Sequence, residues 1–283
     1  MRATRFAVAL FVLVSLVGAI ALAQQPALDK PRPIDIRESV WLEELTWMEV
    51  RDLIHAGTTT VIISTGGIEQ NGPYLATGKH NYVLRATCTA IAKKLGDALC
   101  APVVPFVPEG DIEPATGHMR YPGTISLTAA TYKALLTDIA SSLKQHGFEH
   151  VVLIGDSGGN QEGMKEVAQA LSEKWSGGDT SIHYVPEYYD YQALWKWAEQ
   201  AFGWKEESEG IHDDPSISTM MMTVDPNLVR IEERKAKGKA TINGISLVPV
   251  KDAVEAGHKL VEHRADITAT AIKAAIAKSR PSQ

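Results

Sequence analysis

The sequence predicts an α/β protein built around a mainly parallel sheet, and three observations predict it. Short runs of β-branched and apolar residues at 58–64, 101–107, 151–154 and 182–185 are typical of buried strands. Stretches with helical periodicity separate these runs, and strands separated by helices pair in parallel through crossover connections. The chain has 283 residues, of which 45% are hydrophobic, enough to bury one large core.

The N-terminal 23 residues have the pattern of an export signal. Arg2 and Arg5 precede an uncharged apolar run, Phe6–Ala23, which ends in the small-x-small sequence Ala21–Ala23. An uncleaved membrane anchor is the alternative, because the run nearly reaches the ~20 residues that span a bilayer. The cleavage pattern favours an exported protein, periplasmic or extracellular, without membrane contact after cleavage.

Residues 24–40 are polar and contain several prolines, so we expect a lead-in without regular structure, followed by a single domain over 41–283. The first helix of that domain is predicted to run to Ala56. Thr46 is its expected N-cap, and Glu49, three residues later, completes a capping box.

The remaining helices follow the same periodicity. We expect them at about 82–95, at 131–146, from the segment after 160 to about 171, and, as one or two helices, over 250–277. In parallel sheets of this kind, ligands bind at the carboxyl ends of the strands. The loops after Ser64, Val107 and Ile154 are therefore predicted to form one site.

Charge and cysteine content narrow the functional classes. The formal net charge is −6 and no basic stripe is interleaved with aromatic residues, so neither nucleic acid nor a nucleotide cofactor is expected. Cys88 and Cys100 are the two cysteines, and their spacing leaves open whether they form a disulfide. A zinc–cysteine cluster is excluded, because it needs more thiolates than two.

Histidines and carboxylates in the predicted loops suggest a metal site. Glu69 follows the first strand in a glycine-rich loop, and Asp156 follows the third strand. His80 and His118 lie in or beside the loops between them. Carboxylate oxygens and imidazole nitrogens from separate loops are the ligands that zinc and similar divalent cations take.

A serine nucleophile is the alternative chemistry at the same loops. The segment Gly155–Gly159 satisfies the G-x-S-x-G pattern between a strand and a helix, which is the setting of a nucleophile elbow. Ser157 would then be the nucleophile. The partners available downstream are His212, His258 or His263 as base and Asp213 as the orienting acid.

Four segments in the correct order resemble the creatininase (creatinine amidohydrolase) family. Leu45–Trp47 and Gly67–Leu75 are similar to its first motif, G-x-x-E-Q-H-G-P-H-L-P-x-x-x-D. Gly117–Ser126 resembles H-x-x-F-P-G-T-I-S, and Gly155–Asn160 resembles N-G-H-G-G-N. The stretch His212–Pro226 is similar to H-A-G-x-x-E-T-S-x-M with its following D-P.

This resemblance, which covers about residues 41–230, implies a three-layer α/β/α sandwich. It further implies a divalent metal site, often with two zinc or manganese ions, and hydrolysis of non-peptide C–N bonds. Family members are homo-oligomers, often hexamers. By this resemblance we expect a homo-oligomer that acts on a small-molecule amide.

Several metal-binding positions of the family are altered here. Glu69 matches the family's glutamate ligand, whereas Asn71 replaces a histidine, His80 replaces the bridging aspartate, and Ser157 replaces the histidine of N-G-H-G-G-N. Ile217 replaces the acid that follows the matched His212. The two-metal site is therefore not expected to be complete.

The resulting hypothesis is a metal-dependent amidohydrolase with one zinc, manganese or iron ion. Glu69 and His80 would hold the ion with help from Asp156 or His118, and His212 would carry a proton to the leaving nitrogen. The residues expected to bind substrate are Asn71, Ser157 and Asn160. The competing hypothesis, which the altered positions favour, is a creatininase-fold protein that binds a ligand without catalysis.

Overall fold

The computed structural model describes residues 27–279. The expected export segment at 1–23 lies outside the described residues. From Glu38 onward the described chain packs as one compact unit, which is treated by itself below. Residues 27–37 belong to a separate unit without helix or strand among them. No helix of the described chain combines the length and the hydropathy needed to cross a bilayer.

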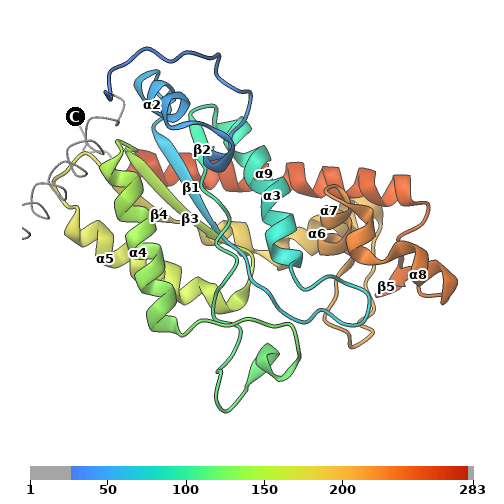
Figure 1. Cartoon of the computed structure of the whole chain (residues 1–283). Coiled ribbons are helices and arrows are strands. Elements are labelled where there is room, and N and C mark those ends of the chain that lie inside the picture. Colours follow the sequence, from blue (N-terminus) through green and yellow to red (C-terminus); the bar gives the residue numbers. More distant parts are fainter. Residues whose placement is uncertain (1–26, 280–283) are drawn as a thin grey trace, which may run out of the picture. The chain divides into compact units, whose positions relative to one another are not determined.

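A four-stranded parallel sheet forms the centre of the compact unit, in the order β2-β1-β3-β4 (Figure 1). The strands are β1 (Thr60–Thr65), β2 (Ala98–Cys100), β3 (His150–Gly155) and β4 (Ser181–Tyr184). All six residues of β1 and all six of β3 are buried, as expected for strands that are covered on both faces.

Alternate residues of the central strands enter two separate hydrophobic clusters. Val61 and Ile63 pack in one cluster with helices α4 (Ala129–Gln145) and α5 (Gln161–Lys174). Ile62 packs on the opposite face in the second cluster. This period-two alternation places helices on both faces and confirms the expected α/β fold.

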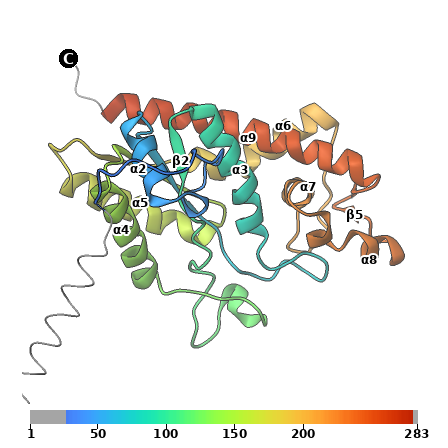
Figure 2. The same ribbon diagram turned by 45° about the horizontal axis from the view of Figure 1, so that its top comes forward.

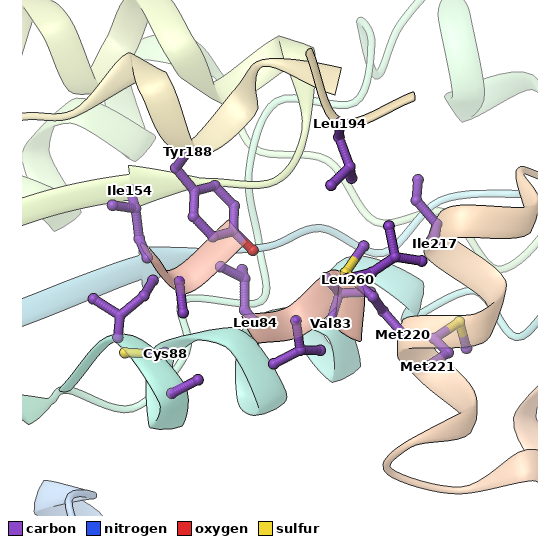
Figure 3. Packing of buried hydrophobic residues seen from close by; sticks show 14 of the residues in the cluster. Val83, Leu84, Cys88, Ile154, Tyr188, Leu194, Ile217, Met220, Met221 and Leu260 are labelled. Atoms are coloured by element: carbon purple, nitrogen blue, oxygen red, sulfur yellow. The ribbon is translucent and has the colours of Figure 1, made fainter. Parts of the chain in front are cut away.

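The second cluster contains three helices that contact one another. They are α3 (Lys79–Leu95), α7 (Pro215–Met222) and the long C-terminal α9 (Val250–Ser279). Figure 3 shows side chains of α3 and α9 meeting those of β3 and α7 in this cluster, and Figure 2 shows α9 running along α3. The cluster also holds a disulfide between Cys88 and Cys100, which ties α3 to β2.

The predicted helix boundaries agree well at most positions. Helix α2 (Trp47–His55) begins after Thr46, whose side chain accepts a bond from the Glu49 amide, and the Glu49 carboxylate accepts one from the Thr46 amide. The expected capping box is confirmed. The C-terminal segment is one helix, α9.

The strand predicted at 101–107 is wrong. The second strand is Ala98–Cys100, and the predicted segment beyond it forms only isolated bridges at Val104 and Val107. Pro102 and Pro105 explain the difference, because proline has no N–H to donate to a strand ladder.

Several shorter elements complete the unit. They are the helix α6 (Tyr191–Phe202), the helix α8 (Ile231–Ala236), the strands β5 (Thr241–Ile242) and β6 (Ile245–Ser246), and the 3-10 turns η1 (Leu42–Glu44), η2 (Gly117–Arg120), η3 (Gly158–Asn160), η4 (Pro186–Tyr189) and η5 (Pro226–Val229).

Candidate active site

A cavity of about 1560 Å³ opens at the carboxyl ends of β1 and β3. The loop after β1 contributes Glu69, the loop after β3 contributes Asp156 and Ser157, and the segment after Val107 contributes Glu109. The expectation that these three loops form one site is therefore confirmed by the lining of the cavity.

Glu69 lies at the centre of the polar groups in this cavity although only 2% of its surface is exposed. Its Oε1 atom lies 2.9 Å from His80 Nε2, 3.0 Å from Lys79 Nζ and 3.0 Å from His212 Nε2. Its Oε2 atom lies 3.2 Å from His118 Nε2. Four cationic or imidazole groups from three separate parts of the sequence therefore converge on one carboxylate.

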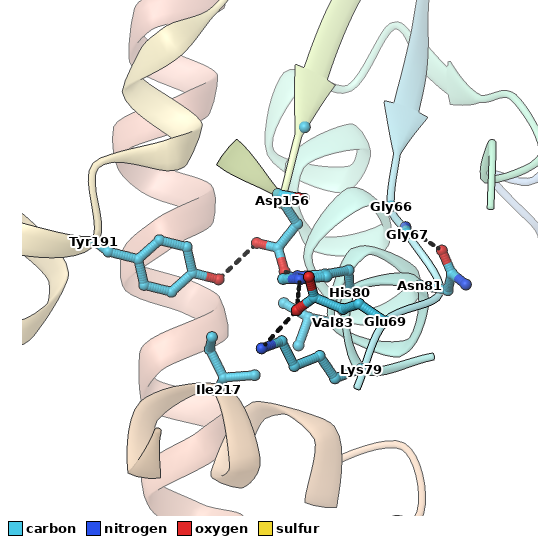
Figure 4. Close-up of polar contacts among 12 residues, drawn as sticks. Gly66, Gly67, Glu69, Lys79, His80, Asn81, Val83, Asp156, Tyr191 and Ile217 are labelled. Atoms are coloured by element: carbon cyan, nitrogen blue, oxygen red, sulfur yellow. Dashed lines mark hydrogen bonds and ion pairs between the residues drawn. The ribbon is translucent and has the colours of Figure 1, made fainter. Parts of the chain in front are cut away.

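The first turn of α3 brings Lys79 and His80 into the site. The helix starts at Lys79, three residues before the predicted boundary, so both side chains point from its amino end toward the Glu69 carboxylate (Figure 4). Asn81, the next residue, accepts a hydrogen bond from the Gly67 amide at 3.2 Å. That bond fixes the loop that carries Glu69 against the same helix.

His80 bridges two carboxylates. Its Nδ1 atom lies 2.8 Å from Asp156 Oδ2, while its Nε2 atom contacts Glu69. Asp156 is fully buried, and its Oδ1 accepts hydrogen bonds from Arg264 Nη1 at 2.8 Å and Tyr191 Oη at 2.7 Å. Arg264 lies on α9, so the C-terminal helix contributes a side chain that holds Asp156 in place.

The pKa values of these groups follow from burial and neighbouring charges. Burial alone would raise the pKa of Glu69, but hydrogen bonds from His212 and His80 and the charges of His80 and Lys79 lower it. Burial alone would likewise raise the pKa of Asp156, but the charge of Arg264 and the contacts with His80 lower it. Both carboxylates are therefore ionised at neutral pH.

The pKa values of His80 and His118, two of the histidines around Glu69, shift in opposite directions. Burial tends to lower the pKa of His80, but its bonds to Asp156 and Glu69 outweigh burial and raise it. Burial lowers the pKa of His118 despite the attraction of Glu69, so His118 is mainly neutral at pH 7 and can act as a metal ligand.

Glu109 differs from the other carboxylates in the cavity. Its side chain is buried, and its Oε1 atom has no hydrogen-bond partner among the described residues. Burial and the neighbouring charge of Glu69 raise the pKa of Glu109 to about 8. This carboxyl therefore carries a proton at neutral pH.

Glu69, His118 and His212 lie close enough together to hold a metal ion. Each offers one ligand atom, and the three atoms lie within 4.8 Å of one another. The two imidazole rings lie with their centroids 4.7 Å apart. A carboxylate with two histidines, leaving a further position open, is the ligand set of several catalytic zinc sites.

The predicted metal ligands separate into two groups. Glu69 and His118 belong to this three-ligand arrangement, joined by His212, which was expected to carry a proton instead. His80 and Asp156 lie deeper and contact each other directly. Lys79, Arg264, Tyr191 and Glu109 were missed, because single lysines, arginines and tyrosines far apart in sequence carry no motif.

Two residues expected to bind substrate hold the backbone of the loops. Asn71 Nδ2 donates to the carbonyl oxygens of Glu69 and Ala76 at 2.9 and 3.1 Å. Asn160 Nδ2 donates to those of Thr65 and Gly66 at 3.0 and 3.2 Å. Both side chains are buried and neither is among the residues that line the cavity, so their expected contact with substrate stays a prediction.

Ser157 does line the cavity, but its geometry does not favour a nucleophile. Its backbone is extended (φ −115°, ψ 148°) instead of strained as in a nucleophile elbow. No histidine of the described chain is hydrogen-bonded to its hydroxyl. His212 is bonded to Glu69, and His263 is stacked on Trp197 at 4.1 Å.

Fold and cavity together define an α/β protein with a buried carboxylate–imidazole centre at the sheet edge, an arrangement suited to hydrolysis. The model of the creatininase family, described as creatinine amidohydrolase, matches residues 43–272. The chain therefore belongs to the creatininase family, and the expected family is confirmed.

Two characterised relatives are similar in sequence. Creatinine amidohydrolase of Pseudomonas putida is 27% identical over 225 residues, which cover 76% of this chain and 84% of that enzyme. The mycofactocin precursor peptide peptidase of Mycolicibacterium smegmatis is 25% identical over 131 residues, covering 44% of this chain and 49% of the peptidase. Both relatives are hydrolases, and the chain is a hydrolase of this family.

Solved creatininase structures share the fold. The crystal structure of creatininase aligns with a TM-score of 0.57 at 22% identity, over 87% of this chain and all of that one. The matched structures include a creatininase of the Zn–Zn type and a manganese creatininase, and another is complexed with creatine.

Proposed function

We propose that this protein is a metal-dependent amidohydrolase that cleaves a C–N bond of a small-molecule amide in the cavity at the sheet edge. The observation that carries the proposal is the convergence of Glu69, His118 and His212, whose ligand atoms lie within 4.8 Å of one another. Family membership and the metals of the related solved enzymes support the same reaction class.

The three side chains fit a single divalent ion. His118 is mainly neutral at pH 7, and Glu69 is ionised, which are the states that coordinate a cation. A bound ion would supply Lewis acidity and lower the pKa of a coordinated water toward ~7. Zinc, manganese and iron all accept this set of nitrogen and oxygen ligands.

Other residues of the chain shape the reaction. Lys79 and His80 hold Glu69 through its Oε1 atom, so the Oε2 atom stays directed toward His118. Glu109 lines the cavity beside Glu69 with an unpaired Oε1 atom, in a position to hand a proton to a leaving nitrogen.

The size of the cavity bears on the substrate. Its volume of about 1560 Å³ exceeds the ~300–1000 Å³ that small-molecule sites usually enclose. Trp195 and Tyr189 contribute aromatic surface to its lining. The cavity therefore admits amides larger than a single ring, and short peptide amides belong in any substrate panel.

The test combines metal content with hydrolysis. The purified full chain is saturated with zinc or manganese, dialysed, and analysed for metal by plasma mass spectrometry, and release of amine is followed on creatinine, formamides and short peptides. We expect close to one equivalent of metal and metal-dependent cleavage of at least one amide.

Substitution assigns the ion to its ligands. His118→Ala and His212→Ala should each reduce bound metal to below a tenth of an equivalent and lower the rate at least a hundredfold. His146→Ala, at the exposed end of α4, is the matched control and should change neither quantity. Binding of an amide without metal or turnover would instead support the non-catalytic alternative and refute the proposal.

Export and assembly are part of the proposal. The buried disulfide between Cys88 and Cys100 is typical of proteins from oxidising compartments, which agrees with the export pattern of the N-terminus. N-terminal sequencing of the periplasmic or secreted form should begin at Gln24. We also propose a homo-oligomer, which light scattering would measure; a monomeric mass would contradict it.

A further inference from the structure

Five charged side chains form a continuous ion-pair chain beneath the cavity. In order they are Lys79, Glu69, His80, Asp156 and Arg264, with each neighbouring pair separated by 2.8 to 3.0 Å. All five are at most 5% exposed. Figure 4 shows Lys79, Glu69, His80 and Asp156 of this chain meeting between the end of the sheet and helix α3.

The contacts of His80 within the ion-pair chain determine which of its ring nitrogens carry hydrogen. Both ring nitrogens lie within 2.9 Å of carboxylate oxygens, one from Glu69 and one from Asp156. An ionised carboxylate only accepts hydrogen bonds, so both nitrogens carry hydrogen and neither has a free lone pair. His80 therefore has no ring nitrogen left for a metal ion, whereas His118 contacts Glu69 through Nε2 alone and its Nδ1 has no hydrogen-bond partner among the described residues.

Most carboxylate oxygens of the ion-pair chain also have hydrogen-bond or ion-pair partners. Asp156 uses Oδ1 for Arg264 and Tyr191 and Oδ2 for His80. Glu69 Oε1 contacts Lys79 and His80, and also His212 Nε2 at 3.0 Å, while its Oε2 atom contacts His118. Lys79 and Arg264 balance the charges of the two carboxylates, which leaves no net negative charge to attract a divalent ion there.

The ion pairs coincide with the motif positions that differ from the family. His80 stands where the family has its bridging aspartate, and Ser157 stands where it has a histidine. The first change removes a carboxylate that can bridge two cations, and the second removes an imidazole. Lys79 and Arg264, which are not among the altered motif positions, add positive charge at the same place.

We propose that the ion-pair chain of Lys79, Glu69, His80, Asp156 and Arg264 replaces one of the two metal ions of the family's site and positions Glu69 for a single ion held with His118 and His212. The second half of this statement rests on the proposed metal-dependent function. His80 is then a positioning residue: it holds the Oε1 atom of Glu69, as hydrogen-bonding partners commonly hold metal-bound carboxylates.

Zinc titration of the full-length protein tests the two halves. Wild type should bind no more than one equivalent at saturation. His80→Asn should keep that single equivalent but bind it about tenfold more weakly, the usual cost of losing a partner behind a ligand. His118→Asn should lose the ion, and His146→Asn should match wild type. Two equivalents in wild type, or loss of the ion from His80→Asn, would overturn the inference.

Nitrogen-15 spectra of histidine-labelled wild type give a second readout that does not depend on how well the variants fold. The His80 resonances are assigned with whichever of His80→Asn and His80→Gln is soluble. Both ring nitrogens should retain hydrogen before and after zinc is added, even if wild type binds no zinc and the proposed function fails. A zinc-coordinated or hydrogen-free nitrogen in His80 would refute the replacement of a metal ion by the ion-pair chain.

Discussion

Replacing Arg264 by methionine should destabilise the protein strongly. Arg264 Nη1 lies 2.8 Å from Asp156 Oδ1, and the two side chains are 3% and 0% exposed. The guanidinium also lies over the rings of Tyr188 and Tyr191, at 4.6 and 4.3 Å from their centroids. Methionine preserves most of the apolar stem but leaves the Asp156 carboxylate buried without its strongest partner.

The expected magnitude follows from these contacts. Breaking a buried ion pair by removing one partner costs about 3–5 kcal/mol, and loss of the cation–π contacts adds roughly 1 kcal/mol. Tyr191 and His80 remain as donors to Asp156, which keeps the total loss at about 4 kcal/mol. With the steep denaturant slope of a large chain, the urea midpoint should fall by about 1–2 M.

Urea unfolding followed by circular dichroism measures this change, with two comparisons. Lys259→Ala removes an exposed ion pair with Glu255 on the same helix and should leave the midpoint unchanged. The double variant Asp156→Asn/Arg264→Met has no buried charge left unpaired and should be more stable than Arg264→Met alone. The reasoning is refuted if Arg264→Met loses less than about 1 kcal/mol, or if the double variant recovers nothing.

Three further predictions concern packing, pH and the disulfide. Gly257→Ala on α9 should lower the melting temperature, because the added carbon would lie 2.1 Å from the backbone oxygen of Thr219 on α7. An unchanged melting temperature would show that the two helices separate easily. Burial and the charge of a nearby imidazole lower the pKa of His183 to about 4. As pH falls, the unfolded chain therefore binds this proton before the folded protein does. The free energy of unfolding should decrease by on the order of 3 kcal/mol between pH 6.5 and pH 4. Urea unfolding at pH 7 and pH 5 should show a smaller loss in His183→Gln than in wild type, and equal losses would contradict the assignment. The double variant Cys88→Ala/Cys100→Ala should lose about 3 kcal/mol of unfolding free energy, the loop-closure value for a sequence separation of 12. Calorimetry of the reduced wild type should show most of the same loss.

The sequence predicted the framework because local patterns encode it. The capping box at Thr46 and Glu49 depends on contacts between residues three apart in sequence. The apolar composition of the runs that form β1 and β3 likewise predicts that these strands are buried. Strand β2 was misplaced because the β-branched run after Cys100 contains prolines, whose missing N–H groups matter only when a neighbouring strand is present.

The chemistry of the site was predicted in part for the same reason. Glu69 and His118 were recognised because they lie in motifs, and motif positions are read along the chain. Their distances to His212 and to each other, however, depend on where three loops meet in space. The motif alone therefore indicated a metal site but assigned the ion to His80 and Asp156 as well.

What the sequence determined by itself was the parallel α/β scaffold, the family, and a carboxylate–imidazole centre at the ends of the strands. Tertiary structure alone decided the partners of that centre. Arg264 comes from a helix 108 residues beyond Asp156, and Lys79 enters the site because α3 begins one turn earlier than its apolar pattern. Charges so far apart in sequence influence one another only after folding brings them within about 3 Å in a medium that screens them weakly.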